Sequence, residues 1–316
     1  MTNRRAFVGT LASTIGALAL REPASAQAVP AKIRLLAVPV DLYALGYYAQ
    51  DGGFFAKAGL DVDIASMAGG SAVLTAVLGG SAEIGISSVV ALAAAVTRGV
   101  QLTILSGSGL CTTEQPSYLL CVSKTSPVVS AKELNGKTIA VVSLSDTATV
   151  ATYTFLAKNG VDRSTLHFFE MPIPVMGAAL QAGRVDAALI SEPALSVALN
   201  TVARSVGNPF NALGSPVTVG AFFATLEWVR ANTAMAQRFV TAMDAAARWS
   251  NTHRDETAAI LSKYSKLDLT TAESMVRCPN TGNLTVKMVQ PVLDAALAAN
   301  LLIRHVNASE LMTKVS

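Results

Sequence analysis

Three short segments of small polar residues stand where apolar runs give way to helical patterns. They are Gly69-Gly70-Ser71, Ser87-Ser88 and the segment 143–147 (Ser-Leu-Ser-Asp-Thr). Helix N-termini offer free N–H groups and a partial positive charge, so three such termini with hydroxyl side chains suit one small polar ligand. The alternative is that each Ser or Thr only caps its own helix. The repetition of this placement favours ligand binding.

The motifs of common enzyme classes do not occur in the sequence. His167, His253 and His305 are far apart, and no His-x-x-x-His or Cys-x-x-Cys pair predicts a metal site. The segment 85–88 (Gly-Ile-Ser-Ser) lacks the closing glycine of a nucleophile elbow. Neither a phosphate-binding loop nor a dinucleotide fingerprint is found. We therefore expect no catalytic residue, no metal and no cofactor, in a protein that is not an enzyme.

The hydrophobic pattern predicts a scaffold that brings these segments together. From residue 32, short apolar runs alternate with helical stretches, which indicates an α/β fold with mostly parallel sheets flanked by helices. In such sheets, ligands bind at the carboxyl ends of the strands. The predicted strands are 32–38, 60–66, 82–87, 102–106, 118–123, 137–142, 166–170, 185–190 and 217–224. The predicted helices are 47–57, 72–78, 89–98, 145–159, 175–182, one from about 192, 233–252, 255–264, 270–277 and 286–299.

The strand and helix pattern restarts at residue 137, which predicts two lobes. Lobe 1 comprises residues 32–117 plus 218–316, and lobe 2 comprises residues 118–217. Two chain crossings between the lobes would form a hinge, with the ligand in the cleft.

Composition excludes several classes of protein. Apolar residues make up 51% of the 316 residues, which excludes a disordered chain. No apolar run reaches the roughly 18 residues of a membrane-spanning helix. The net charge is only +3 with no long basic run, so no nucleic-acid partner is expected. Cys111 and Cys121 could be bridged after export or remain buried thiols, and Cys278 is expected to be unpaired.

The first 26 residues resemble an export signal. Arg4-Arg5 precedes a mild apolar stretch that ends near Leu20, and Ala24-Ser25-Ala26 suits a signal peptidase. The Arg4-Arg5-x-Phe7 pattern resembles a twin-arginine signal. We predict a periplasmic protein exported by that route, with cleavage after Ala26 or Ala28. The alternative is an ordinary amphipathic N-terminal helix.

The segment 46–62 resembles the opening of the sulfonate, nitrate, taurine and thiamine-pyrimidine (NMT/THI-like) solute-binding proteins. Further matching segments follow at that family's spacing: 69–71, 85–88, 134–141, 179–188 and 192–193. The resemblance implies a two-lobe periplasmic binding protein fold of type II. It also implies capture of a small polar organic solute, of the sulfonate, taurine or aminopyrimidine type, for an ABC importer with a permease in the inner membrane.

Carried over position by position, the resemblance implies a ligand site between the lobes. Its residues would be Asp41, Tyr43, Gly70, Ser71, Ser87, Ser88, Ser145, Asp146, Thr147 and Glu192. The loops that carry them contain acidic residues but no Lys or Arg, whereas a buried anion usually has a guanidinium or ammonium partner. We therefore expect a ligand with an N–H or amine group rather than a simple dianion. The alternative is that Asp146 and Glu192 only cap their helices.

Two other functions are compatible with the same fold. One is an enzyme of the menaquinone-pathway or pyrimidine-synthase type, and the other is a binding protein that feeds a sensor. The pyrimidine synthases need a Lys-bound cofactor in a Cys-rich site, which three scattered cysteines and an export signal disfavour. We expect a monomer whose partners are a small-molecule ligand and the permease.

Overall fold

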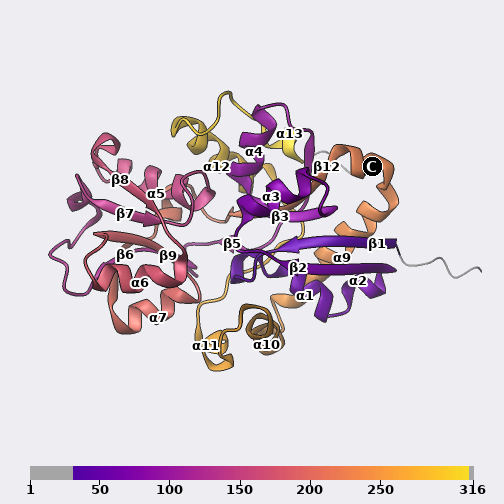
Figure 1. Ribbon diagram of the computed structural model, residues 1–316, viewed down its shortest axis with the longest axis horizontal. Helices are drawn as coiled ribbons and strands as arrows, with labels where there is room; N and C mark the ends of the chain where they lie inside the picture. Colours follow the sequence, from indigo (N-terminus) through magenta and orange to yellow (C-terminus); the bar gives the residue numbers. More distant parts are fainter. Residues whose placement is uncertain (1–30, 313–316) are drawn as a thin grey trace, which may run out of the picture. The chain divides into compact units, whose positions relative to one another are not determined.

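Two five-stranded sheets flanked by helices organise residues 31–312, which are the residues that the computed structural model describes (Figure 1). The predicted α/β fold class is confirmed. The predicted export signal, residues 1–26, lies outside the described residues.

The first sheet has the order β2-β1-β3-β12-β4. Strand β1 pairs in parallel with β2 and β3, and β12 inserts antiparallel between β3 and β4. In β1, Ile33 and Leu35 are buried while Lys32 and Arg34 are exposed, so the alternation of the sequence sets which face meets the core. The strands are β1 (Ala31–Ala37), β2 (Leu60–Ser66), β3 (Ile84–Ser88), β4 (Leu102–Ser106) and β12 (Gly220–Thr225). The helices that follow its first strands are α1 (Leu45–Asp51), α2 (Phe54–Lys57), α3 (Gly70–Leu78) and α4 (Val89–Thr97).

The second sheet has the order β10-β6-β9-β7-β8. Strand β7 pairs in parallel with β8 and β9, and β6 inserts antiparallel between β9 and β10. The two sheets therefore share one topology. The strands are β6 (Tyr118–Ser123), β7 (Thr138–Val141), β8 (His167–Glu170), β9 (Ala187–Ser191) and β10 (Ala203–Gly207). The helices are α5 (Thr147–Lys158), α6 (Ile173–Gln181) and α7 (Ala194–Thr201).

The chain passes between the sheets twice, next to a small ladder. Strands β5 (Leu110–Cys111) and β11 (Val217–Thr218) pair antiparallel there. Residues 31–312 fall within a single compact unit, and the lobe boundaries at 117 and 217 stay a prediction.

The C-terminal part of the chain is mostly helical, as predicted. Helix α9 packs on α1 and α2, and α12 packs against both α4 and α5. The helices are α8 (Leu226–Ala231), α9 (Thr233–Ser250), α10 (Arg254–Ser265), α11 (Leu269–Ser274), α12 (Val286–Ala298) and α13 (Ala308–Leu311). Short 3₁₀ turns are η1 (Asp41–Tyr43), η2 (Ala131–Leu134), η3 (Arg163–Thr165) and η4 (Pro209–Ala212).

Some elements differ from the sequence prediction. The helix predicted at 47–57 is two helices, because Gly53 adopts φ +73° and ends the first one. The strand predicted at 217–224 is interrupted between β11 and β12. Short elements such as β5 and β10 were not predicted. Within residues 31–312, no helix is long and apolar enough to cross a membrane.

Candidate functional site

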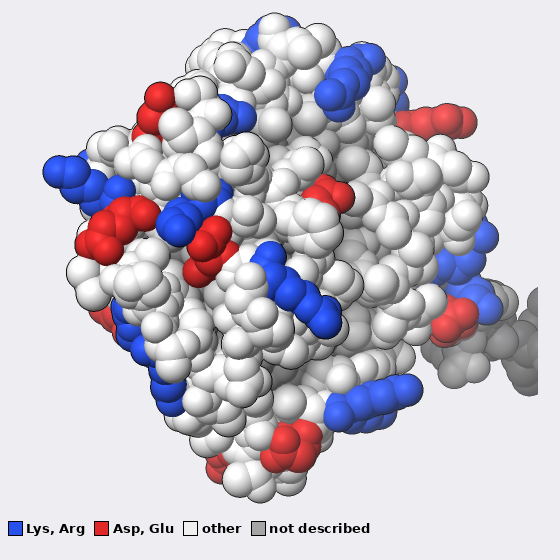
Figure 2. Space-filling model, turned by 60° about the vertical axis from the view of Figure 1, so that its left-hand side comes forward, with Lys and Arg blue, Asp and Glu red and all other residues white. Residues whose placement is uncertain are grey.

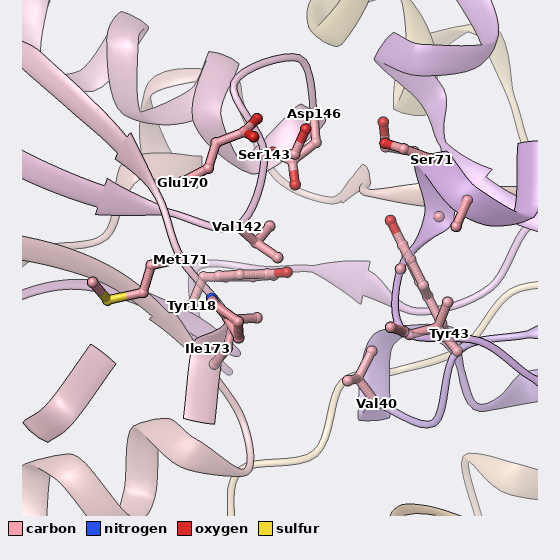
Figure 3. A pocket seen from close by; sticks show the side chains of 17 residues that line it. Val40, Tyr43, Ser71, Tyr118, Val142, Ser143, Asp146, Glu170, Met171 and Ile173 are labelled. Atoms are coloured by element: carbon pink, nitrogen blue, oxygen red, sulfur yellow. The ribbon is translucent and has the colours of Figure 1, made fainter. Parts of the chain in front are cut away.

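A cavity of about 490 Å³ lies between strand ends of the two sheets (Figure 3). Figure 3 shows Tyr43 and Ser71 on one side, with Tyr118, Asp146 and Glu170 on the other. The lining residues are Val38, Val40, Tyr43, Ala68, Gly69, Gly70, Ser71, Ala72, Ser88, Tyr118, Val142, Ser143, Asp146, Glu170, Met171, Pro172 and Ile173. Strand ends of α/β sheets are where such folds commonly bind ligands.

The first sheet contributes the N-terminus of α3. The Ser87 hydroxyl donates to the Gly70 carbonyl at 2.9 Å, which fixes the start of α3 against the end of β3. A Cβ atom at Gly70 would lie 3.1 Å from the Ser87 Cα, so the close approach favours glycine. No side chain caps α3, and its first turn opens to the cavity. By contrast, the Ser88 hydroxyl accepts from the Ala91 N–H at 3.1 Å and caps α4.

Two tyrosines form the aromatic part of the lining. Gly220 leaves room for the Tyr43 ring, since a Cβ atom there would lie 2.8 Å from the Tyr43 Cζ. The Tyr118 ring lies across the cavity from Tyr43 (Figure 3). Burial raises the pKa of both phenols, so both keep their protons at neutral pH. They offer neutral hydroxyls and ring faces that suit a flat or cationic ligand.

Two carboxylates give the cavity its charge. Asp146 caps α5 by accepting the Thr149 N–H at 2.9 Å. Burial raises the pKa of Asp146 to about 6, against the opposing effect of the hydrogen bonds from Thr149. The exposed Glu170 accepts the Leu144 N–H at 2.7 Å. The lining residues include no Lys or Arg, so no side-chain cation awaits an anion there.

Five of the ten residues predicted for the site line this cavity: Tyr43, Gly70, Ser71, Ser88 and Asp146. Asp41 does not, because it is 1% exposed and forms an ion pair with Arg277, whose Nε lies 2.6 Å from Oδ1. Its other oxygen accepts the Cys278 N–H at 2.8 Å. The structure therefore places Asp41 in a buried structural ion pair.

The remaining four predicted residues also lie off the lining. Ser87 holds Gly70, as described, and Ser145 is exposed. The Thr147 hydroxyl donates to the Val219 carbonyl at 2.8 Å. Glu192 is 3% exposed and caps α7, where it accepts the N–H and hydroxyl of Ser196 at 3.1 and 2.8 Å. Glu192 faces a second cavity of about 510 Å³, which shares Val40 and Ile173 with the first.

Comparison with protein families gives a match to the NMT1/THI5-like model over residues 43–257, more than half of the chain. The chain belongs to the NMT1/THI5-like family. No curated protein matches the sequence.

Solved structures share the fold of this NMT1/THI5-like chain. The periplasmic aliphatic sulphonate-binding protein SsuA of Escherichia coli is 19% identical with a TM-score of 0.74, over 90% of this chain and 92% of that one. The alkanesulfonate-binding SsuA of Xanthomonas axonopodis pv. citri, bound to MOPS, is 21% identical with a TM-score of 0.75, over 90% and 99%. The periplasmic nitrate-binding protein NrtA of Synechocystis PCC 6803 is 15% identical with a TM-score of 0.69, over 87% and 83%. The predicted periplasmic binding protein fold is therefore confirmed.

Sequence reasoning missed two prominent lining residues of this NMT1/THI5-like site, Tyr118 and Glu170. Tyr118 begins β6, which runs antiparallel to β9, so the start of β6 reaches the cavity edge. A rule based on the carboxyl ends of parallel strands does not find it. Glu170 is the last residue of β8, so it does lie at the carboxyl end of a strand. It was missed because its strand does not end in the small polar residues that indicated the other candidate positions.

Charged side chains do not gather into a large patch on the face of the molecule that Figure 2 shows. Figure 2 shows Lys, Arg, Asp and Glu scattered over one face of the molecule, with no large patch of either sign. Among residues 31–312, no group of three or more His, Cys, Asp and Glu side chains is placed to hold a metal ion.

Proposed function

We propose that this protein is the extracytoplasmic solute-binding component of an ABC importer, which captures a small polar organic solute between its two sheets. The cavity between the strand ends of both sheets carries this proposal. The fold shared with sulfonate- and nitrate-binding periplasmic proteins supports it. The protein binds and releases its ligand without covalent chemistry and delivers it to an inner-membrane permease.

The proposed ligand carries an amine or N–H group. Asp146 and Glu170 line the cavity, and no lining residue is a Lys or Arg. A desolvated anion without a cationic partner is costly, whereas an ammonium group gains from a nearby carboxylate. The ring faces of Tyr43 and Tyr118 add attraction for a cation or a flat heterocycle.

A zwitterion is also accommodated in this proposal. The first turn of α3, at Gly70 and Ser71, has no side-chain cap, so its N–H groups suit a sulfonate or carboxylate oxygen. Figure 3 places Ser71 and Asp146 on different sides of the cavity, which suits a ligand with opposite charges at its two ends. Taurine and aminopyrimidines are therefore the first candidates.

A thermal-shift screen followed by calorimetric titration tests the proposal. The panel contains taurine, an aminopyrimidine, an alkanesulfonate, sulfate and nitrate. We expect ligands with an amine or N–H group to raise Tm, because binding to the native state at 100 times Kd stabilises it by about 2.7 kcal/mol. A rise in Tm with sulfate or nitrate, and none with the nitrogenous ligands, would contradict the ligand class.

The proposed location is the periplasm. It depends on the predicted signal in residues 1–26. Changing Arg4 and Arg5 to Lys is expected to stop export if the twin-arginine route is used. Normal accumulation of this variant in the periplasm would show that another route is used.

A further inference from the structure

Residues 108–111 run antiparallel to residues 278–281. An antiparallel bridge joins Gly109 to Asn280. The hydrogen bonds on either side of this bridge are Thr281 N–H to Ser108 O at 2.9 Å and Leu110 N–H to Pro279 O at 2.8 Å. The register is therefore constant from Ser108–Thr281 to Leu110–Pro279, and its continuation by one pair would place Cys111 opposite Cys278.

In that continued register, the two cysteines would occupy a non-hydrogen-bonded pair. The N–H of Cys278 points away from its partner strand, since it donates to the Asp41 carboxylate. The N–H of Gly109 likewise donates away from the ladder, to Leu42. Opposite residues of such a pair have Cα atoms about 4.5 Å apart and side chains on one face. A disulfide needs Cα atoms roughly 4.4–6.8 Å apart, so this position suits one.

Both thiols are free and lie in the interior of the protein. Cys111 is 2% exposed and Cys278 is 6% exposed. A Cβ atom at Gly109 would lie 2.5 Å from the Cys278 Sγ, so this sulfur occupies the space that glycine leaves beside Cys111. To form a disulfide, the Cys278 side chain has to rotate toward Cys111.

Cys121 is placed differently. It lies in β6, in the second sheet, where its pairing partners are Ala188 and Ser205. It also packs in a separate hydrophobic cluster from Cys111 and Cys278. A Cys111–Cys121 bridge, one alternative left open by the sequence, therefore has no support from strand register.

We propose that Cys111 and Cys278 form a disulfide under oxidising conditions and that Cys121 stays a thiol. The co-reactant is a small-molecule or protein disulfide. One cysteine thiolate attacks that disulfide and releases one thiol, which leaves a mixed disulfide. The second cysteine then attacks the mixed disulfide and releases the second thiol. The two cysteines supply two electrons and two protons, and the co-reactant is reduced to two thiols.

The bridge forms slowly in the folded chain. Burial raises the pKa of both thiols, and the Asp41 carboxylate raises that of Cys278 further. Both thiols, one in β5 and one in the segment 277–281, therefore stay protonated at neutral pH, whereas the thiolate is the attacking species. The bridge would then tie this segment to the strand that leads into the first chain crossing.

Thiol counting on the full chain tests the proposal, with oxidised glutathione as the oxidant. After oxidation, alkylation in denaturant and intact mass measurement, we expect one alkylated cysteine in place of three. Trypsin alone leaves Cys111 and Cys121 in one peptide, because no Lys or Arg lies between Arg98 and Lys124. Added cleavage after Glu114 separates them, and the Cys111 peptide should be linked to the peptide that begins at Cys278.

Matched variants make the outcome decisive. Cys121→Ser should still lose two thiols on oxidation, whereas Cys111→Ser and Cys278→Ser should not form the intramolecular bridge. Oxidation of the urea-unfolded chain is the control, because strand pairing cannot direct which cysteines become linked there. A different set of disulfides in the unfolded chain shows that the fold selects Cys111 and Cys278. Three free thiols after prolonged oxidation of the folded chain, or a link that includes Cys121, would overturn the proposal.

Discussion

At the residue scale, one acidic side chain combines two roles that the sequence presented as alternatives. Asp146 caps α5 through the Thr149 N–H and also lines the cavity. Glu192 also caps a helix, but it faces the neighbouring cavity. The first cavity therefore takes its negative charge from Asp146 and Glu170.

We predict that Asp146 makes binding of an amine ligand depend on pH. Its pKa of about 6 means that it is mostly ionised at pH 7 and mostly protonated at pH 5. Affinity should therefore fall by about tenfold over that interval if the ionised form binds the amine. Asp146→Asn keeps a capping oxygen for α5 but has no charge to lose, so its affinity should be lower at pH 7 and nearly flat with pH. Titration calorimetry at several pH values measures both; an unchanged pH profile in the variant would assign the dependence to another group.

The same group should affect stability without ligand. The folded-state pKa of Asp146 is raised above its ordinary value of 3.8. The stabilising contribution of its protonated form is therefore complete below pH 3.8 and is lost as the pH rises through about 6. The Asp146→Asn variant cannot ionise at this position, so its free energy of unfolding should not show this decrease with pH. In urea denaturation, its stability relative to the native chain should therefore be highest at pH 7. A difference that does not change between pH 4 and 7 would contradict the shift.

We predict that the Asp41–Arg277 pair supports the fold rather than the ligand. Asp41→Ala leaves the Arg277 guanidinium, 8% exposed, without its carboxylate. Loss of one partner of a buried pair costs about 3–5 kcal/mol. The double variant Asp41→Ala with Arg277→Met should lose much less, and its ligand affinity should match the native value. A large loss of affinity in a double variant that is stably folded would place Asp41 in ligand binding after all.

At the element scale, the sequence predicted most strands and helices of both sheets because apolar alternation and glycine caps mark them. Strand β2 was predicted with its observed bounds, since Leu60, Val62 and Ile64 alternate with acidic residues. Pairing direction was not predictable, because it depends on contacts between distant segments. The position of Tyr118 at the cavity edge follows from that direction. Likewise, Asp41 was included in the predicted site from the family resemblance, and nothing local in the sequence indicates Arg277 as its partner.

The contact between α3 and β3 gives a prediction for one glycine. A Cβ atom at Gly85 would lie 2.8 Å from the Val77 methyl and would also meet Val73. Gly85→Ala should push α3 outward, which lowers stability by about 1–3 kcal/mol and displaces the Ser71 end of the cavity. Gly177→Ala in α6 is the matched control. Its Cβ atom would make only ordinary contacts, with Ala198 and Val202, so this change should stabilise the protein by about 0.5–1 kcal/mol. Denaturation and ligand titration of both variants check this, and an affinity unchanged in Gly85→Ala would exclude α3 from the site.

At the scale of the whole molecule, contacts outside the cavity lining connect the parts of the chain that carry the two sheets. Helix α12 packs against α4 and α5, and Arg163 donates to the Ala299 carbonyl at 2.7 Å. Thr147 is tied to Val219, which lies between β11 and β12. If the predicted lobes rotate relative to each other, we expect the axis of rotation to pass near these contacts.

We predict that ligand binding closes the cavity by such a rotation. Small-angle scattering should show a smaller radius of gyration at saturating ligand than without ligand. The Cys121→Ser variant, which removes a buried thiol within the second sheet, should close in the same way. A radius that does not change at saturation would contradict closure of a cleft between lobes.

The position of β12 in the first sheet also determines the order in which the protein can be completed on the ribosome. All five strands of the second sheet, residues 118–207, are translated before residues 220–225 emerge. Until then β4 has no neighbour in its sheet, because β12 is the strand it pairs with. The middle of the chain can therefore complete its sheet first, while the N-terminal strands wait with unpaired edges that are prone to aggregate.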